Sequence, residues 1–269
     1  MTPVTVTQGD GPVILGLPHG GTWLPDDLVA RLNENGQALA DTDWHIGRLY
    51  GGLLPGATTV AATVHRYAID ANRDPAGVSL YPGQNTTGLC PVTDFDGRPI
   101  WQPGQEPSAD EILARSTAFH APYHAALTAE VARVKARHGI AVVYDCHSIR
   151  SRIPFLFEGD LPALNIGTDG GRTCAATIAA CALDRAAASG LSHVLNGRFR
   201  GGWTTRHYGR PETGVHAIQM EIAQSAYLAQ EAAPWRYDAD KAGRLRRWLK
   251  DILDAIADAA TELTKDART

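Results

Sequence analysis

The chain has 269 residues, of which 44% are hydrophobic, and a formal net charge of -4 at pH 7. A chain of this length buries a large core, and a small net charge with both signs interspersed is not typical of a nucleic-acid-binding protein. Apolar runs stop well short of a membrane span, and residues 1–12 lack the basic and apolar regions of a signal peptide. We therefore expect a globular α/β protein with neither nucleic-acid nor membrane partners.

The cysteines indicate a reducing compartment. They occur in unrelated contexts and form no C-x-x-C pair, which argues against disulfide bonds. We therefore expect a cytoplasmic protein. No feature of the sequence indicates an oligomeric state. The four positions are Cys90, Cys146, Cys174 and Cys181.

The first expected strand, residues 12–17, runs into Pro18-His19-Gly20-Gly21-Thr22. Glycine lets the backbone turn tightly and approach a ligand closely, and α/β proteins place their sites at the carboxyl ends of strands. His19 is therefore a candidate ligand or catalyst, with a plain turn residue as the alternative. A short helix is expected next, over residues 25–33.

Asp41, Asp43 and His45 lie within five residues of each other, just before a second helical stretch that extends to Leu53. An aspartate at this place caps a helix, and the same residue types are ligands for hard and borderline metal ions. The cluster predicts a cap, a metal ligand or both, and the sequence alone does not divide these roles.

An alternating stretch, residues 57–64, predicts a strand that leads to Asp70-Ala71-Asn72-Arg73-Asp74-Pro75. The planar guanidinium of Arg73 matches a substrate carboxylate in bidentate geometry, and a salt-bridged loop is the alternative. Residues 74–107 are rich in Pro, Gly and Asn, with aromatic residues between them. A loop this long within a compact domain is usually functional, so we expect a lid or a wall of the site.

A capping-box pattern at residues 108–111 opens a long helix, broken or continuous, to about Arg137. His120 and His124 are spaced i, i+4, a spacing that can form a metal pair on a helix, but no catalytic glutamate lies between them. We interpret both as surface or packing residues.

The apolar residues 140–143 predict a buried strand that ends in Asp145 and His147. Residues two apart in a strand point to the same face, so these two side chains leave the sheet together and Cys146 faces the other way as core filler. A carboxylate beside an imidazole fixes the tautomer and direction of a metal-bound or catalytic histidine. The alternative is a histidine satisfied at a strand end.

The C-terminal half continues the alternation of strands and helices. Short strands are expected over residues 164–168 and 191–195, on either side of an Ala-rich helix over 174–188. A last strand covers 215–222, and an amphipathic helix over 238–263 closes the domain.

The same half supplies cations and one buried glutamate. Arg150 follows the central strand and is a candidate anion clamp. The loop over residues 196–210 contains four arginines, Arg200 and Arg206 among them, and predicts a basic pocket wall, with a solvated basic loop as the alternative. Glu221 lies between apolar neighbours in the last strand, where a carboxylate is costly unless paired, so it is a candidate general base.

Several motifs together resemble those of the N-formylglutamate amidohydrolase family, and the resemblance covers almost the whole chain. They are Leu-Pro-His19-Gly-Gly-Thr-x-Leu-Pro, Asp41-Thr-Asp-Trp-His45, Asp70-x-Asn72-Arg73, Tyr81-Pro-Gly-Gln-Asn-Thr-Thr-Gly-Leu-Cys-Pro, Asp145-x-His147-Ser-Ile-Arg150-Ser, Asn196-Gly-Arg-Phe-Arg-Gly-Gly and Arg206-His-Tyr-Gly-Arg-Pro-x-x-Gly-Val-His-Ala. That family is similar in turn to zinc carboxypeptidases and aspartoacylases. The resemblance implies a single α/β domain over residues 1–269, with a mixed, mostly parallel sheet flanked by helices.

The resemblance also implies roles for individual residues. It implies that His19 and His147 bind one zinc ion, or another divalent metal, with Asp145 behind His147. It further implies that Glu221 is the general base. The substrate's carbonyl and carboxylate are then expected to contact Asn72 and Arg73.

The chain departs from the carboxypeptidase pattern at one position. Those enzymes carry a glutamate ligand three residues after the first histidine, where this chain has Thr22. The third ligand is therefore expected elsewhere. We expect Asp43 because a carboxylate keeps the charge of the site, with His45 second and Asp41 third.

The implied activity is zinc-dependent hydrolysis of N-formyl-L-glutamate to formate and L-glutamate, in histidine degradation. This substrate is a small dianion and needs two cationic clamps, which we expect to be Arg73 and one of Arg150, Arg200 and Arg206. The alternatives are a zinc amidohydrolase for another N-acyl or N-formyl amino acid or a related formamide, and a non-catalytic protein that binds a small anion on the same scaffold. A metal-free serine or cysteine hydrolase is disfavoured, because the chain lacks a Gly-x-Ser-x-Gly elbow.

Overall fold

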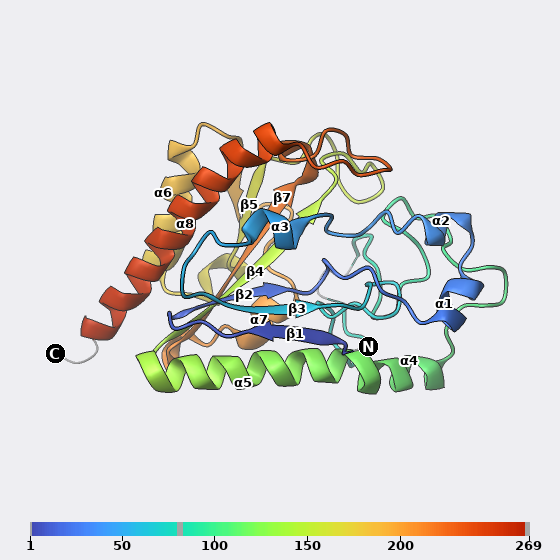
Figure 1. Ribbon diagram of the computed structural model, residues 1–269, viewed down its shortest axis with the longest axis horizontal. Coiled ribbons are helices and arrows are strands. Elements are labelled where there is room, and N and C mark those ends of the chain that lie inside the picture. Colours follow the sequence, from blue (N-terminus) through green and yellow to red (C-terminus); the bar gives the residue numbers. More distant parts are fainter. Residues whose placement is uncertain (1, 80–82, 267–269) are drawn as a thin grey trace.

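The computed structural model describes residues 2–79 and 83–266, which are built around one seven-stranded sheet in the order β1-β3-β2-β4-β7-β5-β6 (Figure 1). The strands are β1 (Val4–Thr7), β2 (Val13–Leu17), β3 (Thr58–Ala62), β4 (Ala141–Ile149), β5 (Leu164–Gly167), β6 (His193–Leu195) and β7 (Val215–Ala223). β3, β2, β4 and β7 are parallel to one another, and β6 is parallel to β5. β1 pairs antiparallel with β3, and β5 pairs antiparallel with β7.

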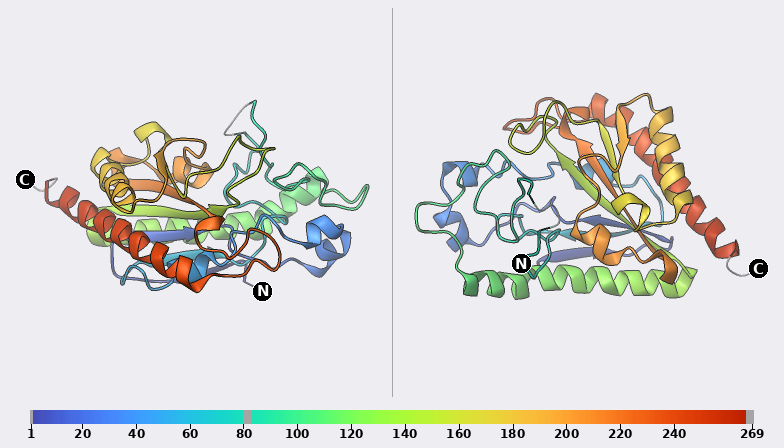
Figure 2. Two further views of the ribbon diagram at one scale, coloured as in Figure 1. Left: turned by 90° about the horizontal axis from the view of Figure 1, so that it is seen from above. Right: turned by 180° about the vertical axis from the view of Figure 1, so that it is seen from behind.

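Helices flank this sheet, as the sequence predicts. They are α1 (Asp26–Arg31), α2 (Glu34–Gln37), α3 (Ile46–Tyr50), α4 (Ala109–Arg115), α5 (Ala121–His138), α6 (Ala176–Ala188), α7 (Trp203–Tyr208) and α8 (Ala239–Asp266). α6 and α8 pack side by side, and Figure 2 shows α5 as a long rod set apart from that pair. The expected α/β class, with a mixed and mostly parallel sheet, is confirmed.

The two faces of the sheet have separate cores, and the alternation along β4 assigns its side chains to them. Val142, Tyr144 and Cys146 belong to the core that α3, α6 and α8 cover. Val143 belongs to the core beneath α5 and α7. Because side chains alternate along a strand, Asp145 and His147 leave the sheet on the α5 face, opposite to Cys146.

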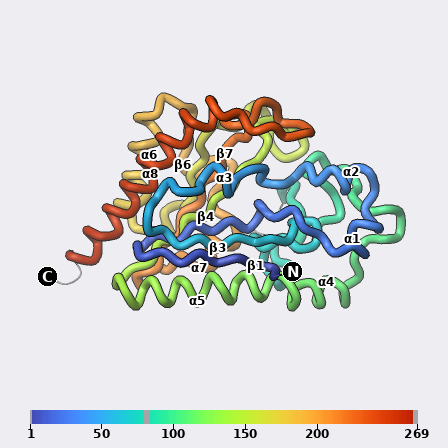
Figure 3. Tube along the Cα trace, viewed as in Figure 1, coloured from blue at the N-terminus to red at the C-terminus, as the bar shows by residue number. Residues whose placement is uncertain are grey.

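Central parallel strands are covered on both faces, so nearly all of their side chains are buried. Every residue of β2 and of β4 is buried. In β4 the ionisable side chains Asp145 and His147 lie between the midpoint of the strand and its carboxyl end. The connections on that side, including α1, α2 and the segment between β3 and α4, gather at the end of the molecule away from the C-terminus (Figure 3).

Three features of the fold differ from the sequence-based expectation. β1 was not expected, because it is a four-residue edge strand whose side chains are mostly exposed. α2 is a single turn capped by the side chain of Asn33 and was not expected either. The loop predicted over 196–210 contains α7, whose first turn depends on a tertiary contact: the Thr204 amide donates to the Asn72 side chain at 2.8 Å.

The long helix predicted from residue 108 is continuous but not uniform. A π-helical turn, Ser116–His120, joins α4 to α5 just before Pro122. Proline has no N–H to donate and its ring crowds the carbonyl one turn back, which accounts for the wider turn at this point. In residues 2–79 and 83–266, no helix combines the length and the apolar character that crossing a membrane requires.

The packing of α8 generates a stability prediction. Leu249 is fully buried in the core shared with α6. Leu249→Ala should lower the free energy of unfolding by about 2–5 kcal/mol, because it removes buried apolar surface and leaves a cavity. Urea denaturation of both proteins measures the difference.

Asp258→Ala, on the exposed side of the same helix, is the matched control and should change that free energy by no more than about 0.5 kcal/mol. Equal effects of the two substitutions would contradict a structural role for α8.

Candidate metal centre

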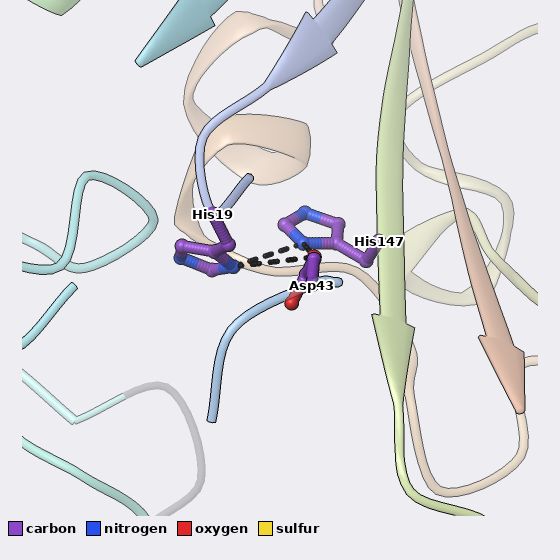
Figure 4. Close-up of side chains that lie close together, drawn as sticks. All are labelled: His19, Asp43 and His147. Atoms are coloured by element: carbon purple, nitrogen blue, oxygen red, sulfur yellow. Dashed lines mark hydrogen bonds and ion pairs between the residues drawn. The ribbon is translucent and has the colours of Figure 1, made fainter. Parts of the chain in front are cut away.

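Three buried side chains converge where the parallel strands end. His147 lies in β4, His19 follows β2, and Asp43 lies in the turn before α3, tied to the carbonyl of His19 through its own amide at 3.1 Å. Figure 4 shows the three side chains pointing toward one another. Nδ1 of His19 is 3.1 Å from Nδ1 of His147. Oδ2 of Asp43 is 3.8 Å from the first nitrogen and 3.4 Å from the second.

These separations fit one bound metal ion. Nitrogen and oxygen ligands about 2.1 Å from a zinc ion, at tetrahedral angles, lie roughly 3.4 Å apart, and the three separations here are 3.1, 3.4 and 3.8 Å. Two imidazoles and one carboxylate are also a ligand set found in open zinc sites. The three residues are therefore able to hold a metal ion.

A carboxylate lies behind each histidine. Nε2 of His19 is 2.7 Å from Oδ1 of Asp70, and Nε2 of His147 is 2.9 Å from Oδ2 of Asp145. An ionised carboxylate only accepts hydrogen bonds, so each Nε2 donates and each Nδ1 keeps its lone pair for the centre. The spacing of Asp145 and His147 predicts the second contact. The role of Asp70 was missed, although the sequence shows it two residues before Asn72.

Arg66 is a second residue that sequence reasoning missed. Its buried guanidinium lies 2.9 Å from Oδ2 of Asp70 and 3.9 Å from Oδ1 of Asp43. Nη2 of Arg66, which makes the contact with Asp70, also lies 3.0 Å from both ring nitrogens of His19. A buried carboxylate needs a partner, so the buried Asp70 is the one signal that could have prompted a search for this cation.

The charges set the protonation of the centre. Burial and the neighbouring Arg66 lower the pKa of His19 to about 4. Burial also lowers the pKa of His147, but Asp145 and Asp43 outweigh it and raise this pKa well above its ordinary value. For Asp70 burial acts upward, yet the surrounding cations hold its pKa well below the ordinary range. These shifts favour a neutral ring at His19 and a second proton on the ring of His147, which a bound metal ion would displace from Nδ1.

Glu221 stands beside the centre on β7. It pairs in register with His147 on the neighbouring parallel strand, so the two side chains leave the same face of the sheet. Gln219 donates to its Oε2 at 3.1 Å. Burial, followed by repulsion from Asp43 and against the pull of His147, raises the pKa of Glu221 to about 8.

A cleft opens onto the group, with about 190 Å³ accessible to the centres of water molecules. Asn72, Arg73 and Glu221, three of the site residues expected from the sequence, line it. The loop expected to be a lid or a wall, residues 74–107, forms one wall of the cleft through residues such as Val78 and Phe95. Tyr81 and Pro82, part of a motif quoted above, lie outside the described residues.

The structure does not bring the other predicted metal ligands into the group. His45 has a left-handed backbone at the start of α3, and its Nε2 lies 2.8 Å from the carbonyl oxygen of Trp235. Oδ2 of Asp41 accepts from the Tyr67 hydroxyl and from the Phe95 amide, both at 2.9 Å. Burial raises the pKa of Asp41 to about 7. Asp43 is therefore the carboxylate that reaches the two histidines.

The arginines expected to provide the second clamp lie away from the cleft lining. Arg150 lies 3.0 Å from Asp96, and Arg206 contacts the carbonyl of Gly201 and the carboxylate of Asp169. Neither these two nor the exposed Arg200 is among the described residues that line the cleft. Arg198 of the same loop does line it, with Nε bound to the carbonyl of Leu156 at 3.1 Å. The sequence shows four arginines in this loop and no signal that separates them.

The position of Arg66 generates a prediction. Arg66→Met should lower the free energy of unfolding by about 3–5 kcal/mol, measured in urea with a metal chelator present, because Asp70 and Asp43 lose a buried cation. Arg66→Lys keeps the charge and should cost less. A methionine variant as stable as the parent protein would contradict this electrostatic role.

The sequence and the fold are similar to those of known proteins. A sequence model of the family described as N-formylglutamate amidohydrolase matches residues 11–228. The chain is 46% identical over 255 residues to an N-formylglutamate deformylase of Pseudomonas aeruginosa, covering 93% of this chain and 94% of that protein. It is 43% identical over 255 residues to an N-formylglutamate deformylase of Pseudomonas putida, covering 93% of each.

Two solved structures share the fold over nearly the whole chain. The crystal structure of N-formylglutamate amidohydrolase from Ralstonia eutropha JMP134 has a TM-score of 0.79 at 25% identity, covering 96% of this chain and 97% of that one. The structure of a gene product from Agrobacterium tumefaciens has a TM-score of 0.67 at 21% identity, covering 96% of each chain, and shows likeness of fold alone.

Proposed function

The chain belongs to the N-formylglutamate amidohydrolase family, and on that premise we propose that it is a zinc-dependent enzyme that hydrolyses N-formyl-L-glutamate to formate and L-glutamate. The family match agrees with the motifs found in the sequence. The observation that carries the metal-dependent chemistry is the buried His19, Asp43 and His147 group with Glu221 beside it. The names of the curated relatives support the substrate.

We assign the metal to His19, Asp43 and His147, with Asp70 and Asp145 fixing the two imidazoles. When bound, a zinc ion polarises a carbonyl group and lowers the pKa of a water molecule. The protein's part is to present two imidazole lone pairs and one carboxylate oxygen in a buried place. Arg66 offsets the negative charge that these carboxylates bring.

Glu221 is the proposed general base. It lines the cleft next to His147, and burial raises its pKa to about 8, so the carboxylate takes up a proton more readily than an exposed glutamate. A general base works best when its pKa lies near the working pH, and a cation bound beside Glu221 would lower this pKa towards neutrality. In the proposed mechanism Glu221 takes the proton of the attacking water and delivers it to the amide nitrogen as the C–N bond breaks.

The two carboxylates of N-formyl-L-glutamate are assigned to two arginines of the cleft. Arg73 is held by Thr87, whose carbonyl and hydroxyl accept from Nε at 2.9 Å and from Nη2 at 3.0 Å. Arg198 approaches from a different segment, the loop before α7. Because a guanidinium matches a carboxylate plane, two arginines from separate segments favour a dianion over a monoanion.

One feature favours a second candidate function. The cleft is also lined by apolar side chains, including Val78, Leu156 and Phe199. An apolar wall suits an acyl group larger than formyl, so another N-acyl amino acid is the second candidate substrate.

We further propose a cytoplasmic location and a role in histidine degradation. The four free cysteine thiols support a reducing compartment.

The test of the function is formate release from N-formyl-L-glutamate. We expect release by the zinc-loaded protein, loss of release after treatment with a chelator, and recovery when zinc is added. A parallel assay with N-acetyl-L-glutamate separates the second candidate. No release from a folded, zinc-loaded sample would contradict the proposed reaction.

The role of Glu221 generates a separate prediction. Glu221→Gln should lower kcat by about a hundredfold or more while the bound zinc stays at one ion per chain by elemental analysis. The reason is that glutamine keeps the shape of the side chain but accepts no proton. Glu212→Gln, at an exposed position on the approach to β7, is the control and should leave kcat unchanged. Parental kcat in the Glu221 variant would remove it from the mechanism.

Arg198 allows a prediction on specificity. Arg198→Met should raise KM for N-formyl-L-glutamate by about tenfold to a hundredfold, because one charge-assisted contact is lost, with a smaller change in kcat. Arg185→Met, on an exposed side of α6, should leave both constants unchanged. Steady-state kinetics distinguish these outcomes, and an unchanged KM in the Arg198 variant would exclude it as a clamp.

A further inference from the structure

Two buried histidines outside the metal group contact the backbone that carries Asn72 and Arg73. Nε2 of His124 lies 2.7 Å from the carbonyl oxygen of Ala71. Nε2 of His120 lies 3.0 Å from the carbonyl oxygen of Arg73. The sequence predicts that both histidines are surface or packing residues. They are packing residues, because His120 is 3% exposed and His124 is 9% exposed.

The direction of both hydrogen bonds is fixed. A carbonyl oxygen only accepts, so each imidazole donates from Nε2. Burial lowers the pKa of His120, and it lowers that of His124 to about 3, so both rings are neutral at pH 7. Nδ1 of His124 is then an acceptor and lies 3.0 Å from the hydroxyl of Tyr208.

The two rings are themselves held between rigid elements. They are one turn apart on the rod formed by α4, the π-helical turn and α5, and π-helical turns occur frequently at functional sites. The indole ring of Trp203, in α7, lies 5.4 Å from the ring of His120 and 4.6 Å from the ring of His124. On the same rod, Arg115 donates to the carbonyl of Ala68 at 3.0 Å.

The side chains of the contacted segment face the site. The backbone N–H of Asn72 donates to Oδ1 of Asp70. Its side-chain Nδ2 lies 3.1 Å from Nε2 of His147. Arg73 lines the cleft. Asn72 and Arg73 therefore direct their side chains to the metal group and the cleft, while the carbonyl groups of Ala71 and Arg73 bind the histidines of the helical rod.

We propose that His120 and His124 are positioning residues, which fix the backbone from Ala71 to Arg73 and thereby aim Arg73 at a substrate carboxylate. Neither histidine is among the described residues that line the cleft, so both act through the segment that they hold. The identity of the carboxylate rests on the proposed function. The claim that the pair holds the segment rests on the contacts alone.

The experiment compares substitutions that remove or keep the donor. Leucine at position 120 or 124 removes the N–H, whereas glutamine places an amide N–H near the place of Nε2. His120→Leu and His124→Leu should each raise KM for N-formyl-L-glutamate about tenfold, with zinc content and kcat nearly unchanged, because one buried hydrogen bond is lost. His120→Gln and His124→Gln should restore KM to within about threefold of the parent value.

Amide hydrogen exchange provides a readout that needs no substrate. Exchange in a peptide covering residues 69–75 should be faster in the leucine variants and near parental in the glutamine variants. Val134→Ala, buried further along α5, is the matched control: it should lower stability without changing KM or this exchange. If a leucine variant does not fold, asparagine replaces it, since its amide is too short to reach the carbonyl.

The outcomes distinguish failure of the positioning proposal from failure of the proposed function. Unchanged exchange in the donor-free variants, or faster exchange with an unchanged KM, would overturn the proposal. Glutamine variants as impaired as the leucine variants would also overturn it, because ring packing and not donation would then matter. If the parent protein releases no formate, the proposed function fails, and hydrogen exchange still decides whether the pair holds the segment.

Discussion

The centre depends on one interaction made twice: a buried carboxylate that accepts a hydrogen bond from the far nitrogen of a buried imidazole. Asp70 does this for His19 at 2.7 Å, and Asp145 does it for His147 at 2.9 Å. Both contacts leave Nδ1 facing Asp43. Two lone pairs and a carboxylate oxygen that converge on one point require a proton or a metal cation between them. The geometry thus favours a cation before any relative is considered.

The sheet supplies the registration that this arrangement needs. β2, β4 and β7 are adjacent and parallel, so their carboxyl ends lie at one edge. The pairing of β4 with β7 puts His147 beside Glu221, which brings the proposed ligand and the proposed base together without any loop. Loops then contribute the remaining groups, Asp43 and Arg73, and each is tied down by hydrogen bonds to its surroundings.

Much of this could be predicted from the sequence where the chain is periodic. The two-residue step of a strand predicts that Asp145 and His147 share a face, and the position of Glu221 among apolar residues predicts its burial. Loop geometry has no such period. The left-handed backbone at His45 turns its ring toward Trp235, and the sequence ranks Asp43 ahead of His45 on charge alone. Arg66 and Arg198 were missed because only tertiary contacts reveal them, through the buried Asp70 and through the path of the chain into α7.

The central claim is that one metal ion binds to Nδ1 of His19, Oδ2 of Asp43 and Nδ1 of His147. Anomalous diffraction at the zinc absorption edge, from crystals of the zinc-loaded protein, tests it most directly. We expect one strong anomalous peak bounded by these three atoms, with Asp70 and Asp145 still bound to the far nitrogens. A peak at His45 or Asp41, or ligation through Nε2 of either histidine, would contradict it.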